Sequence, residues 1–316
     1  MSWYERRAAA AAAPEPQPEP ELQPELQPEL QPEPEPAPAR KPPTVTTTTL
    51  QAGSRLSLQL TQVLEELDED EAWDAADDVT GGLVWAACAE VACLCLAGAA
   101  RLTPASVAAT QVGAAVRAEG RRVAELGAGT GACGIGAALL GASHVLLTDL
   151  PQFCPNIRRN CAANGLQVSQ EGAVQVLPHQ WGAPVSDLGG PFDIVICSEL
   201  LHWPALDIFS EDTLQPLANS ILALLRAPMA SDQGHRKDEG GVALVVYKSR
   251  LPAREATFFE TCEALGLRAV GPFAAETTAE AGETTTEAER GCARSDSGGG
   301  EGEGRPIVFA LWRAEG

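Results

Sequence analysis

The feature that most constrains this chain is a glycine-rich turn that directly follows a short apolar run. The acidic residue Glu125 lies near the end of that run, and glycines then occupy alternate positions, at Gly127, Gly129 and Gly131. A turn with almost no side chains lets the polar groups of a ligand approach the backbone, and the N-terminus of a following helix points at them. The pattern predicts a strand–turn–helix unit that binds a nucleotide-like cofactor, with a glycine turn that binds no ligand as the alternative.

Two classes of cofactor fit this turn. The acidic form of the motif at residues 125–131 is typical of S-adenosylmethionine (AdoMet) sites, whereas residues 129–134 also fit the dinucleotide form Gly-x-Gly-x-x-Gly. Asp149 ends the next expected strand, about twenty residues beyond the first glycine, where either cofactor places its ribose-binding acid. A dinucleotide acid is expected further on, at residues 152–156, where the chain has none, and a pyrophosphate would lie unfavourably beside Glu125. AdoMet is therefore the predicted cofactor.

Apolar runs alternate with helix-forming segments from residue 122 to residue 265. This alternation is typical of a doubly wound sheet, and two apolar runs at the end of the chain fit an antiparallel hairpin. We therefore expect an α/β, Rossmann-like fold with a mostly parallel sheet, a terminal antiparallel hairpin and one extra N-terminal strand at residues 56–61. The seven strands of the sheet are expected at residues 122–126, 143–149, 173–177, 192–197, 242–247, 268–270 and 307–312.

Four candidate site residues each follow a different expected strand, at its carboxyl end: Gly127, Asp149, Trp181 and Glu199. Ligands of doubly wound sheets bind at this edge. The carboxylate of Asp149 can accept hydrogen bonds from both ribose hydroxyls, although it can instead cap a helix that begins at Pro151. The face of Trp181 suits one wall of an adenine site, with a tryptophan at the rim as the alternative.

Glu199 is the residue that we expect to act on the acceptor, because it lies where the methyl group has to meet the nucleophile. Methyl transfer from a sulfonium is an in-line displacement that the enzyme mainly has to align. A carboxylate can hold an ammonium group on arrival and direct the amine after its proton is lost to water. His202 can orient the substrate or accept a proton, or it can be a packed histidine at the end of a strand.

The remaining candidates have weaker support. Glu125 is expected either to order the glycine turn and bind the methionyl amine or to be a purely structural acid. Trp85 fits the core as well as the cofactor site, and Ser198 completes the expected cofactor-binding set. Asn156 and Asn160 can equally be solvent-facing residues of a helix.

Low-complexity segments flank and interrupt the expected domain at residues 50–316. Residues 14–43 repeat Pro-Glu and Glu-Leu-Gln-Pro units, in which proline removes backbone donors and the glutamates repel one another. We therefore expect residues 1–49 to form a disordered arm. Residues 274–304 are acidic and rich in Thr, Glu and Gly without periodicity, which predicts a disordered insertion in a hairpin loop.

Composition excludes several other classes. A net charge of −21 without a polybasic block argues against direct binding of nucleic acid. Nine cysteines form no Cys-x-x-Cys pair and are accompanied by only four histidines, so we expect free thiols in a reducing compartment and no metal site. The longest apolar run, residues 83–100, contains Glu90 and is short for a membrane span, which favours a core helix and no membrane contact.

The order of these motifs resembles that of the seven-β-strand AdoMet-dependent methyltransferases, in particular the family-16, lysine-methyltransferase-like group. The resemblance covers about residues 56–312, apart from the insertion. The family usually has Tyr or Phe where this chain has His202. The matching motifs are Thr80–Trp85, Glu125–Gly131, Thr148–Pro151 with Asn156 and Asn160, Trp181–Gly182, Glu199–His202, and Tyr247–Arg250 with Phe258, Phe259 and Gly266.

The resemblance implies an AdoMet-dependent protein N-methyltransferase whose acceptor is a lysine of a non-histone protein. Two alternatives stay open: a small-molecule N- or O-methyltransferase, which His202 favours, and a non-catalytic AdoMet-binding interaction protein that uses the Pro/Glu arm. An NAD-dependent dehydrogenase fits the motifs least. We expect a monomer in the cytoplasm, with the nucleus as the other candidate compartment, and an acidic surface that suits a basic protein partner.

Overall fold

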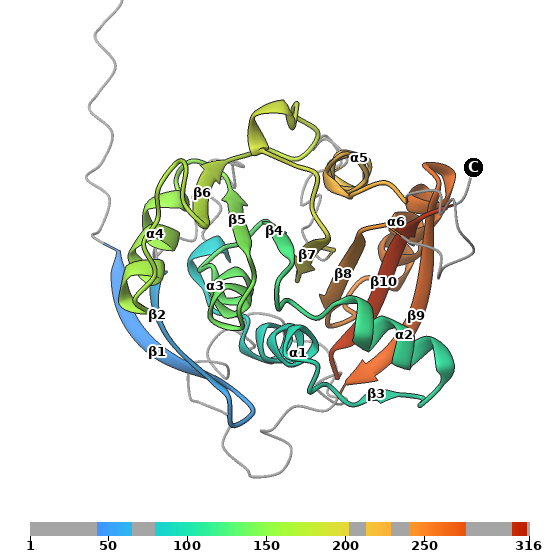
Figure 1. The fold of residues 1–316 in the computed structure, drawn as a ribbon, viewed down its shortest axis with the longest axis horizontal. Helices are drawn as coiled ribbons and strands as arrows, with labels where there is room; N and C mark the ends of the chain where they lie inside the picture. Colours follow the sequence, from blue (N-terminus) through green and yellow to red (C-terminus); the bar gives the residue numbers. More distant parts are fainter. Residues whose placement is uncertain (1–42, 65–79, 202–212, 229–239, 276–304, 315–316) are drawn as a thin grey trace, which may run out of the picture. The chain divides into compact units, whose positions relative to one another are not determined.

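The structure, a computed structural model, describes residues 43–64, 80–201, 213–228, 240–275 and 305–314. Within them, the main sheet has eight strands in the order β3-β9-β10-β8-β7-β4-β5-β6 (Figure 1). Five of these strands are parallel and form one side of the sheet. They are β4 (Arg122–Leu126), β5 (His144–Asp149), β6 (Val174–Pro178), β7 (Ile194–Ser198) and β8 (Val242–Tyr247).

The other three strands of the sheet are antiparallel to their neighbours. β10 (Ile307–Arg313) pairs with both β8 and β9 (Leu267–Ala275), and the short β3 (Leu102–Thr103) pairs with the far edge of β9. The predicted doubly wound, mostly parallel sheet with a closing antiparallel pair is therefore confirmed. β3 was not expected, because a strand of two residues leaves no periodic pattern in the sequence.

The N-terminal strand belongs to a separate two-stranded antiparallel sheet. The strand expected at residues 56–61 is β2 (Leu56–Leu64), and its partner is β1 (Thr44–Ala52), which begins inside the range assigned to the arm. The first four residues of β1 are exposed, so its run of threonines has strand propensity without the apolar alternation that indicates a strand. The rest of the arm and most of the insertion lie outside the described residues.

Helices cover both faces of the main sheet, in two apolar clusters (Figure 1). Parallel strands are expected to be buried on both faces, which leaves the ends of the strands for a ligand site. No helix in the described part of the chain is long and apolar enough to span a bilayer. The first cluster contains residues of the β1–β2 hairpin and of α1 (Ala86–Leu96), α2 (Val107–Ala115), α3 (Ala132–Leu139) and α4 (Cys154–Ala163). The second contains residues of α5 (Leu214–Leu224) and α6 (Pro252–Ala264).

Asparagines spaced four residues apart along α4 and its C-terminal cap bind the backbone of β2. Asn164 accepts from the N–H of Gln59 (3.0 Å) and donates to its carbonyl oxygen (2.8 Å). Asn160 makes the same two bonds to Thr61, at 2.7 and 3.2 Å, and Asn156 also donates to the Thr61 carbonyl, at 3.0 Å. Four helical residues rise about 6 Å and two strand residues about 6.6 Å, so the two spacings match. These amides therefore pair with the edge of β2 that faces away from β1.

The turn before α1, η2 (Thr80–Gly82), lies between β2 and the glycine turn. A Cβ atom on Gly82 would lie 2.1 Å from the carbonyl oxygen of Val63, and one on Gly129 would lie 3.1 Å from the carbonyl oxygen of Gly81. These close approaches of backbone to backbone leave no room for a side chain. The β1–β2 hairpin therefore packs against η2, and η2 packs against the glycine turn.

Candidate functional site

The glycine turn, Asp149 and Glu199 lie at one edge of the sheet, where the parallel strands end. β4 pairs in parallel with β5 on one side and with β7 on the other. The glycine turn follows β4, Asp149 is the last residue of β5, and Glu199 directly follows β7. The two carboxylates therefore lie at the same edge of the sheet, on either side of the strand that leads into the glycine turn.

The glycine turn presents backbone rather than side chains. All three of its predicted glycines have positive φ angles, 59°, 55° and 83° at Gly127, Gly129 and Gly131. A Cβ atom on Gly127 would lie 2.7 Å from Cδ2 of Leu200 and 3.1 Å from Cζ2 of Trp181. Both the backbone angle and the space therefore require glycine here, and the surface that results fits a nucleoside cofactor.

Asp149 binds the glycine turn directly. One carboxylate oxygen accepts from the N–H of Gly129 (2.6 Å) and the other from the N–H of Leu150 (2.7 Å). A carboxylate offers about four lone-pair sites, so these two bonds are compatible with a ribose hydroxyl on the same group. The alternative as a helix cap does not apply, because α4 begins at Cys154 with Phe153 as its N-cap.

Glu125 is buried beneath the glycine turn rather than exposed at its surface. Its Oε2 accepts from the N–H of Gly134 in the first turn of α3 (2.7 Å). Burial raises the pKa of its carboxyl from about 4.5 to about 8, although the Gly134 N–H and the Cys133 side chain act in the opposite direction. The structural role expected for this acid is thus observed, and its role toward the methionyl amine stays a prediction.

Trp181 is half-buried and packs against the second apolar cluster with its indole beside Gly127, as the wall of an adenine site requires. The loop that carries it is fixed by α5, because the Ser220 hydroxyl accepts from the N–H of Gly182 (2.9 Å) and lies 3.3 Å from Nε2 of His179. The loop that carries Trp181 is therefore held beside the glycine turn by α5.

Two further predicted cofactor residues have other neighbours. Trp85 directly precedes α1, is half-buried, and faces the guanidinium of Arg250, whose Cζ lies 5.3 Å from the centre of its ring. Ser198 lowers the pKa of the buried Cys133 thiol, against the larger opposite effect of burial. Trp85 therefore belongs to the surroundings of Glu199, and Ser198 acts on a thiol at the start of α3, beside the glycine turn.

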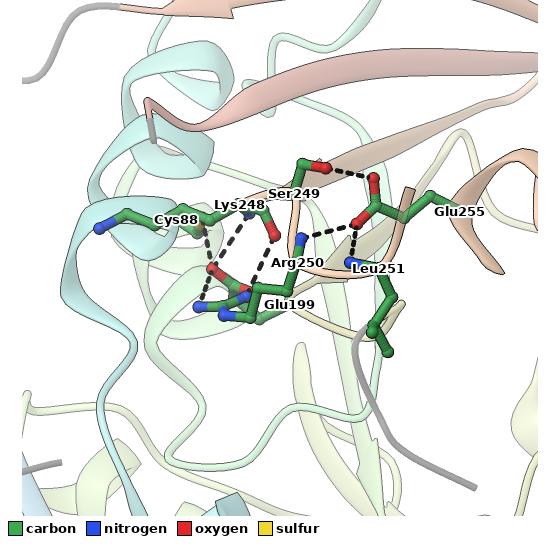
Figure 2. Close-up of polar contacts among 7 residues, drawn as sticks. All are labelled: Cys88, Glu199, Lys248, Ser249, Arg250, Leu251 and Glu255. Carbon is green, nitrogen blue, oxygen red and sulfur yellow. Dashed lines mark hydrogen bonds and ion pairs between the residues drawn. The ribbon is translucent and has the colours of Figure 1, made fainter. Parts of the chain in front are cut away.

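Glu199 is the centre of a cluster of polar contacts (Figure 2). Its Oε1 accepts from the Cys88 thiol (2.8 Å) and from the N–H of Lys248 (3.3 Å), and its Oε2 is 2.5 Å from Nη1 of Arg250. Burial and the charge of Glu199 both raise the pKa of the Cys88 thiol well above its ordinary value, so the thiol stays protonated and donates. The cluster therefore fixes both oxygens of the carboxylate.

The backbone of Glu199 is also unusual. Among the residues that the structure describes, it is the only non-glycine residue with a positive φ, at 58°. Such a conformation costs about 1–3 kcal/mol and persists where the surroundings impose it, which is common at functional sites. Here the Glu199 N–H donates to the Val246 carbonyl (2.8 Å). The Glu199 carboxylate makes four further contacts, one with the Cys88 thiol, one with the Lys248 N–H and two with the Arg250 guanidinium.

A second buried carboxylate fixes the segment that carries Arg250. Glu255, in the first turn of α6, accepts from the hydroxyl of Ser249 (2.7 Å) and from the backbone N–H groups of Arg250 (2.8 Å) and Leu251 (2.9 Å) (Figure 2). The segment 248–251 is therefore bound by a carboxylate at each end, by Glu199 at Lys248 and by Glu255 at Leu251.

The sequence reasoning missed Arg250 and Cys88 as partners of Glu199. Arg250 follows β8 at the same edge of the sheet, so the rule that identified the other site residues applies to it as well. Cys88 carries no comparable signal, because a cysteine in an apolar helix is usually a small core residue. His202 lies outside the described residues, and its role stays a prediction.

The described part of the chain holds no group of three or more His, Cys, Asp or Glu side chains placed to bind a metal ion. The eight cysteines that the structure describes are free and buried, from Cys88 to Cys262. Three properties of this edge fit AdoMet: a glycine turn that has no room for side chains, a carboxylate held by its backbone and an aromatic wall beside it.

Comparison with known proteins decides the family. A family model described as lysine methyltransferase matches residues 66–264, which is more than half of the chain. The chain belongs to the lysine methyltransferase family. The resemblance inferred from the order of the motifs is therefore confirmed.

Two relatives illustrate this membership. EEF1A lysine methyltransferase 3 from Xenopus tropicalis is 39% identical over 84 residues, which are 27% of this chain and 36% of that protein. Protein N-terminal and lysine N-methyltransferase efm7 from Aspergillus fumigatus is 28% identical over 167 residues, 49% of this chain and 58% of that protein. The matched region thus spans between about one third and three fifths of the length of these relatives.

Among solved structures, the chain is similar to ribosomal protein L11 methylase from Lactobacillus delbrueckii subsp. bulgaricus. The identity is 16% and the TM-score 0.39, with 72% of this chain and 79% of that chain covered. A methyltransferase solved in complex with SAH gives 12% identity and a TM-score of 0.49, with 84% and 56% covered. Both likenesses are distant, and the family assignment rests on the sequence match.

Proposed function

We propose that this protein is an AdoMet-dependent protein-lysine N-methyltransferase that modifies another protein. One observation carries the proposal: the region matched by the lysine methyltransferase family contains a sheet edge where Asp149 and Glu199 lie on either side of the glycine turn. One carboxylate is placed for a nucleoside and the other for an acceptor.

The cofactor side of the site consists of Asp149, the glycine turn and Trp181. Asp149 accepts hydrogen bonds from the ribose, and the backbone that it already binds at Gly129 keeps it in place. Trp181 forms a wall of the adenine site, and Glu125 holds the start of α3 through Gly134. When bound, AdoMet supplies an activated methyl group on a sulfonium.

Glu199 is the group that meets the acceptor. It holds the lysine ammonium on arrival, and the ammonium then loses a proton to water, because only the neutral amine can attack. The carboxylate keeps the nitrogen in line with the methyl group, so that the nitrogen–carbon bond forms as the carbon–sulfur bond breaks and sulfur keeps the electron pair. Alignment of this kind is the main contribution that an enzyme makes to such a displacement.

The names of the relatives suggest the acceptors to test first. One is named for a lysine of EEF1A, and the other for both lysine and the protein N-terminus. Both acceptors are primary amines that are ammonium ions at neutral pH, which suits a carboxylate at the site. The net charge of −21 favours a basic protein as partner.

Radiolabelled AdoMet tests the proposal. The full chain is incubated with purified EEF1A and, separately, with a cell lysate, and labelled proteins are digested and analysed by mass spectrometry. We expect labelled protein bands with the methyl group on a lysine side chain. Label only in the small-molecule fraction, or no transfer to any acceptor, would contradict the proposal, and label on an α-amino group would move the acceptor to the protein N-terminus.

A further inference from the structure

The carboxylate of Glu199 is covered in the structure. Its side chain is 3% exposed, whereas the side chain of Arg250, which pairs with it, is 35% exposed. An incoming cation therefore cannot reach the carboxylate unless the guanidinium moves aside. Asp149, by contrast, accepts hydrogen bonds from the backbone N–H groups of Gly129 and Leu150.

The guanidinium of Arg250 occupies a position that suits a cation. On one side, its Nη1 is 2.5 Å from Oε2 of Glu199, and on the other, its Cζ is 5.3 Å from the centre of the Trp85 ring. A carboxylate and an aromatic face together attract cationic groups of several kinds, ammonium as well as guanidinium. The position is therefore selective for charge rather than for arginine.

The side chain of Arg250 can move without its backbone. Glu255 fixes the backbone N–H groups of Arg250 and Leu251, and the Lys248 N–H is bound to Glu199. Nη1 of the guanidinium also donates to the carbonyl oxygen of Lys248 (3.1 Å). The guanidinium is 35% exposed, and a competing cation that pairs with Glu199 in its place leaves no uncompensated buried charge, so such a cation can displace it.

We propose that Arg250 is a specificity-determining residue whose guanidinium occupies, between Trp85 and Glu199, the position that the acceptor's ammonium group takes during the reaction. The inference rests on the proposed function, because it gives Glu199 an ammonium acceptor. An acceptor displaces Arg250 to bind, and an uncharged side chain cannot displace it. Arg250 thereby selects for cationic acceptors and weakens their binding at the same time.

The test measures binding of n-butylammonium chloride, which has the same charged end as a lysine side chain, by ligand-observed NMR in the presence of S-adenosylhomocysteine. Arg250→Gln removes the competing cation, and we expect butylammonium to bind about tenfold more tightly than to the wild type. A matched control is Arg268→Gln, because Arg268 makes the same contact with Trp312 at 5.3 Å but lies on β9. We expect the control to bind as the wild type does.

Unchanged or weaker binding to Arg250→Gln would overturn the proposal, because an arginine that only supports Glu199 gives that result. If Arg250→Gln does not fold, the wild type still provides a test through the NMR signal of the Arg250 side-chain N–H, identified by its loss in Arg250→Lys. We expect butylammonium to shift this signal and leave that of Arg268 unchanged, and no shift would overturn the proposal. Neither measurement requires methyl transfer, so a failed labelling experiment contradicts the proposed function and not the cation site.

Discussion

The ends of β5 and β7 carry the same chemical group with different surroundings. Asp149 accepts from two backbone N–H groups, and the partner in the glycine turn is 20 residues away along the chain. Glu199 accepts from side chains that are 111 and 51 residues away, Cys88 and Arg250. The carboxylate on the cofactor side is therefore held by backbone N–H groups, and the one on the acceptor side by two distant side chains together with the N–H of Lys248.

This difference means that the partners of Asp149 are fixed by the fold, whereas the side-chain partners of Glu199 can change. A backbone N–H stays in place when a neighbouring side chain is replaced, so the cofactor side depends on the fold itself. Side-chain partners can be replaced or displaced one at a time, so the acceptor side is where specificity can be adjusted. The substitutions below test that division, in order of decreasing expected effect.

Glu199→Gln is expected to have the largest effect. The amide keeps the shape of the side chain but cannot hold an ammonium group, so we expect methyl transfer to fall at least about a hundredfold. Binding of S-adenosylhomocysteine, measured by calorimetry, is expected to change less than about threefold, because Asp149 holds the cofactor side. Glu119→Gln, an exposed acid before β4, is the matched control. Equal activity of the variant and the wild type would remove Glu199 from its proposed role.

Asp149→Asn is expected to weaken binding of the cofactor product, which Glu199→Gln leaves nearly unchanged. The amide retains one acceptor for the Gly129 N–H and loses the charge that strengthens a bond to ribose, a loss of about 1.5–3 kcal/mol. We expect S-adenosylhomocysteine to bind roughly 10–100-fold more weakly in calorimetry. Asp187→Asn replaces an exposed acid and is expected to leave the affinity unchanged. Wild-type affinity in Asp149→Asn would show that the cofactor does not depend on the carboxylate at the end of β5 as proposed.

Glu125→Gln tests the acid beneath the glycine turn through pH. The pKa of Glu125 is raised to about 8 in the fold, from about 4.5, so between these values the folded state holds a proton that the unfolded state has lost. Stability therefore falls as pH rises through this window, by about 2 kcal/mol between about pH 5.5 and 7, and changes no further above about pH 8.

The glutamine variant has no such proton, and its amide oxygen can still accept from Gly134. Denaturant unfolding at several pH values should therefore give a difference in the free energy of unfolding, variant minus wild type, that grows with pH inside the window. A difference that stays constant with pH would mean that Glu125 is not protonated in the fold.

Cys88→Ala is expected to have the smallest effect. The thiol is a weak donor, and Lys248 and Arg250 still bind the carboxylate of Glu199 without it. We expect methyl transfer to fall by less than about threefold and stability by about 1 kcal/mol or less, measured by labelling and by thermal unfolding. A loss as large as that in Glu199→Gln would make Cys88, rather than the cationic partner, the group that holds the acceptor side.

The fold was predictable from the sequence because its signals are local. The strand at residues 242–247 is a continuous apolar run, and the glycine turn that follows residues 122–126 has its own pattern. Strand β1 was missed because exposed threonines carry no alternation, and β3 because it has only two residues. The range assigned to the arm, residues 1–49, consequently includes the first six residues of β1.

The candidate site was predictable to a similar degree. The rule that ligands bind at the carboxyl ends of parallel strands placed Asp149 and Glu199 at one edge, as observed. Of the partners of Glu199, Arg250 follows β8 at that edge and was within reach of the same rule, whereas the Cys88 thiol from α1 carries no such signal. The side-chain amides of Asn156 and Asn160 bind the backbone of β2, a role that is visible only once the hairpin is in place.

The asparagines of α4 have a consequence for anyone who expresses the protein in parts. The family match begins at residue 66, after the hairpin has ended, and stops at residue 264, before β9 and β10. A fragment trimmed to that match would leave the amide of Asn160 without its bonds to Thr61 and would expose the edge of β8. A fragment that keeps the β1–β2 hairpin, β9 and β10 is therefore longer at both ends than the region that the family model matches.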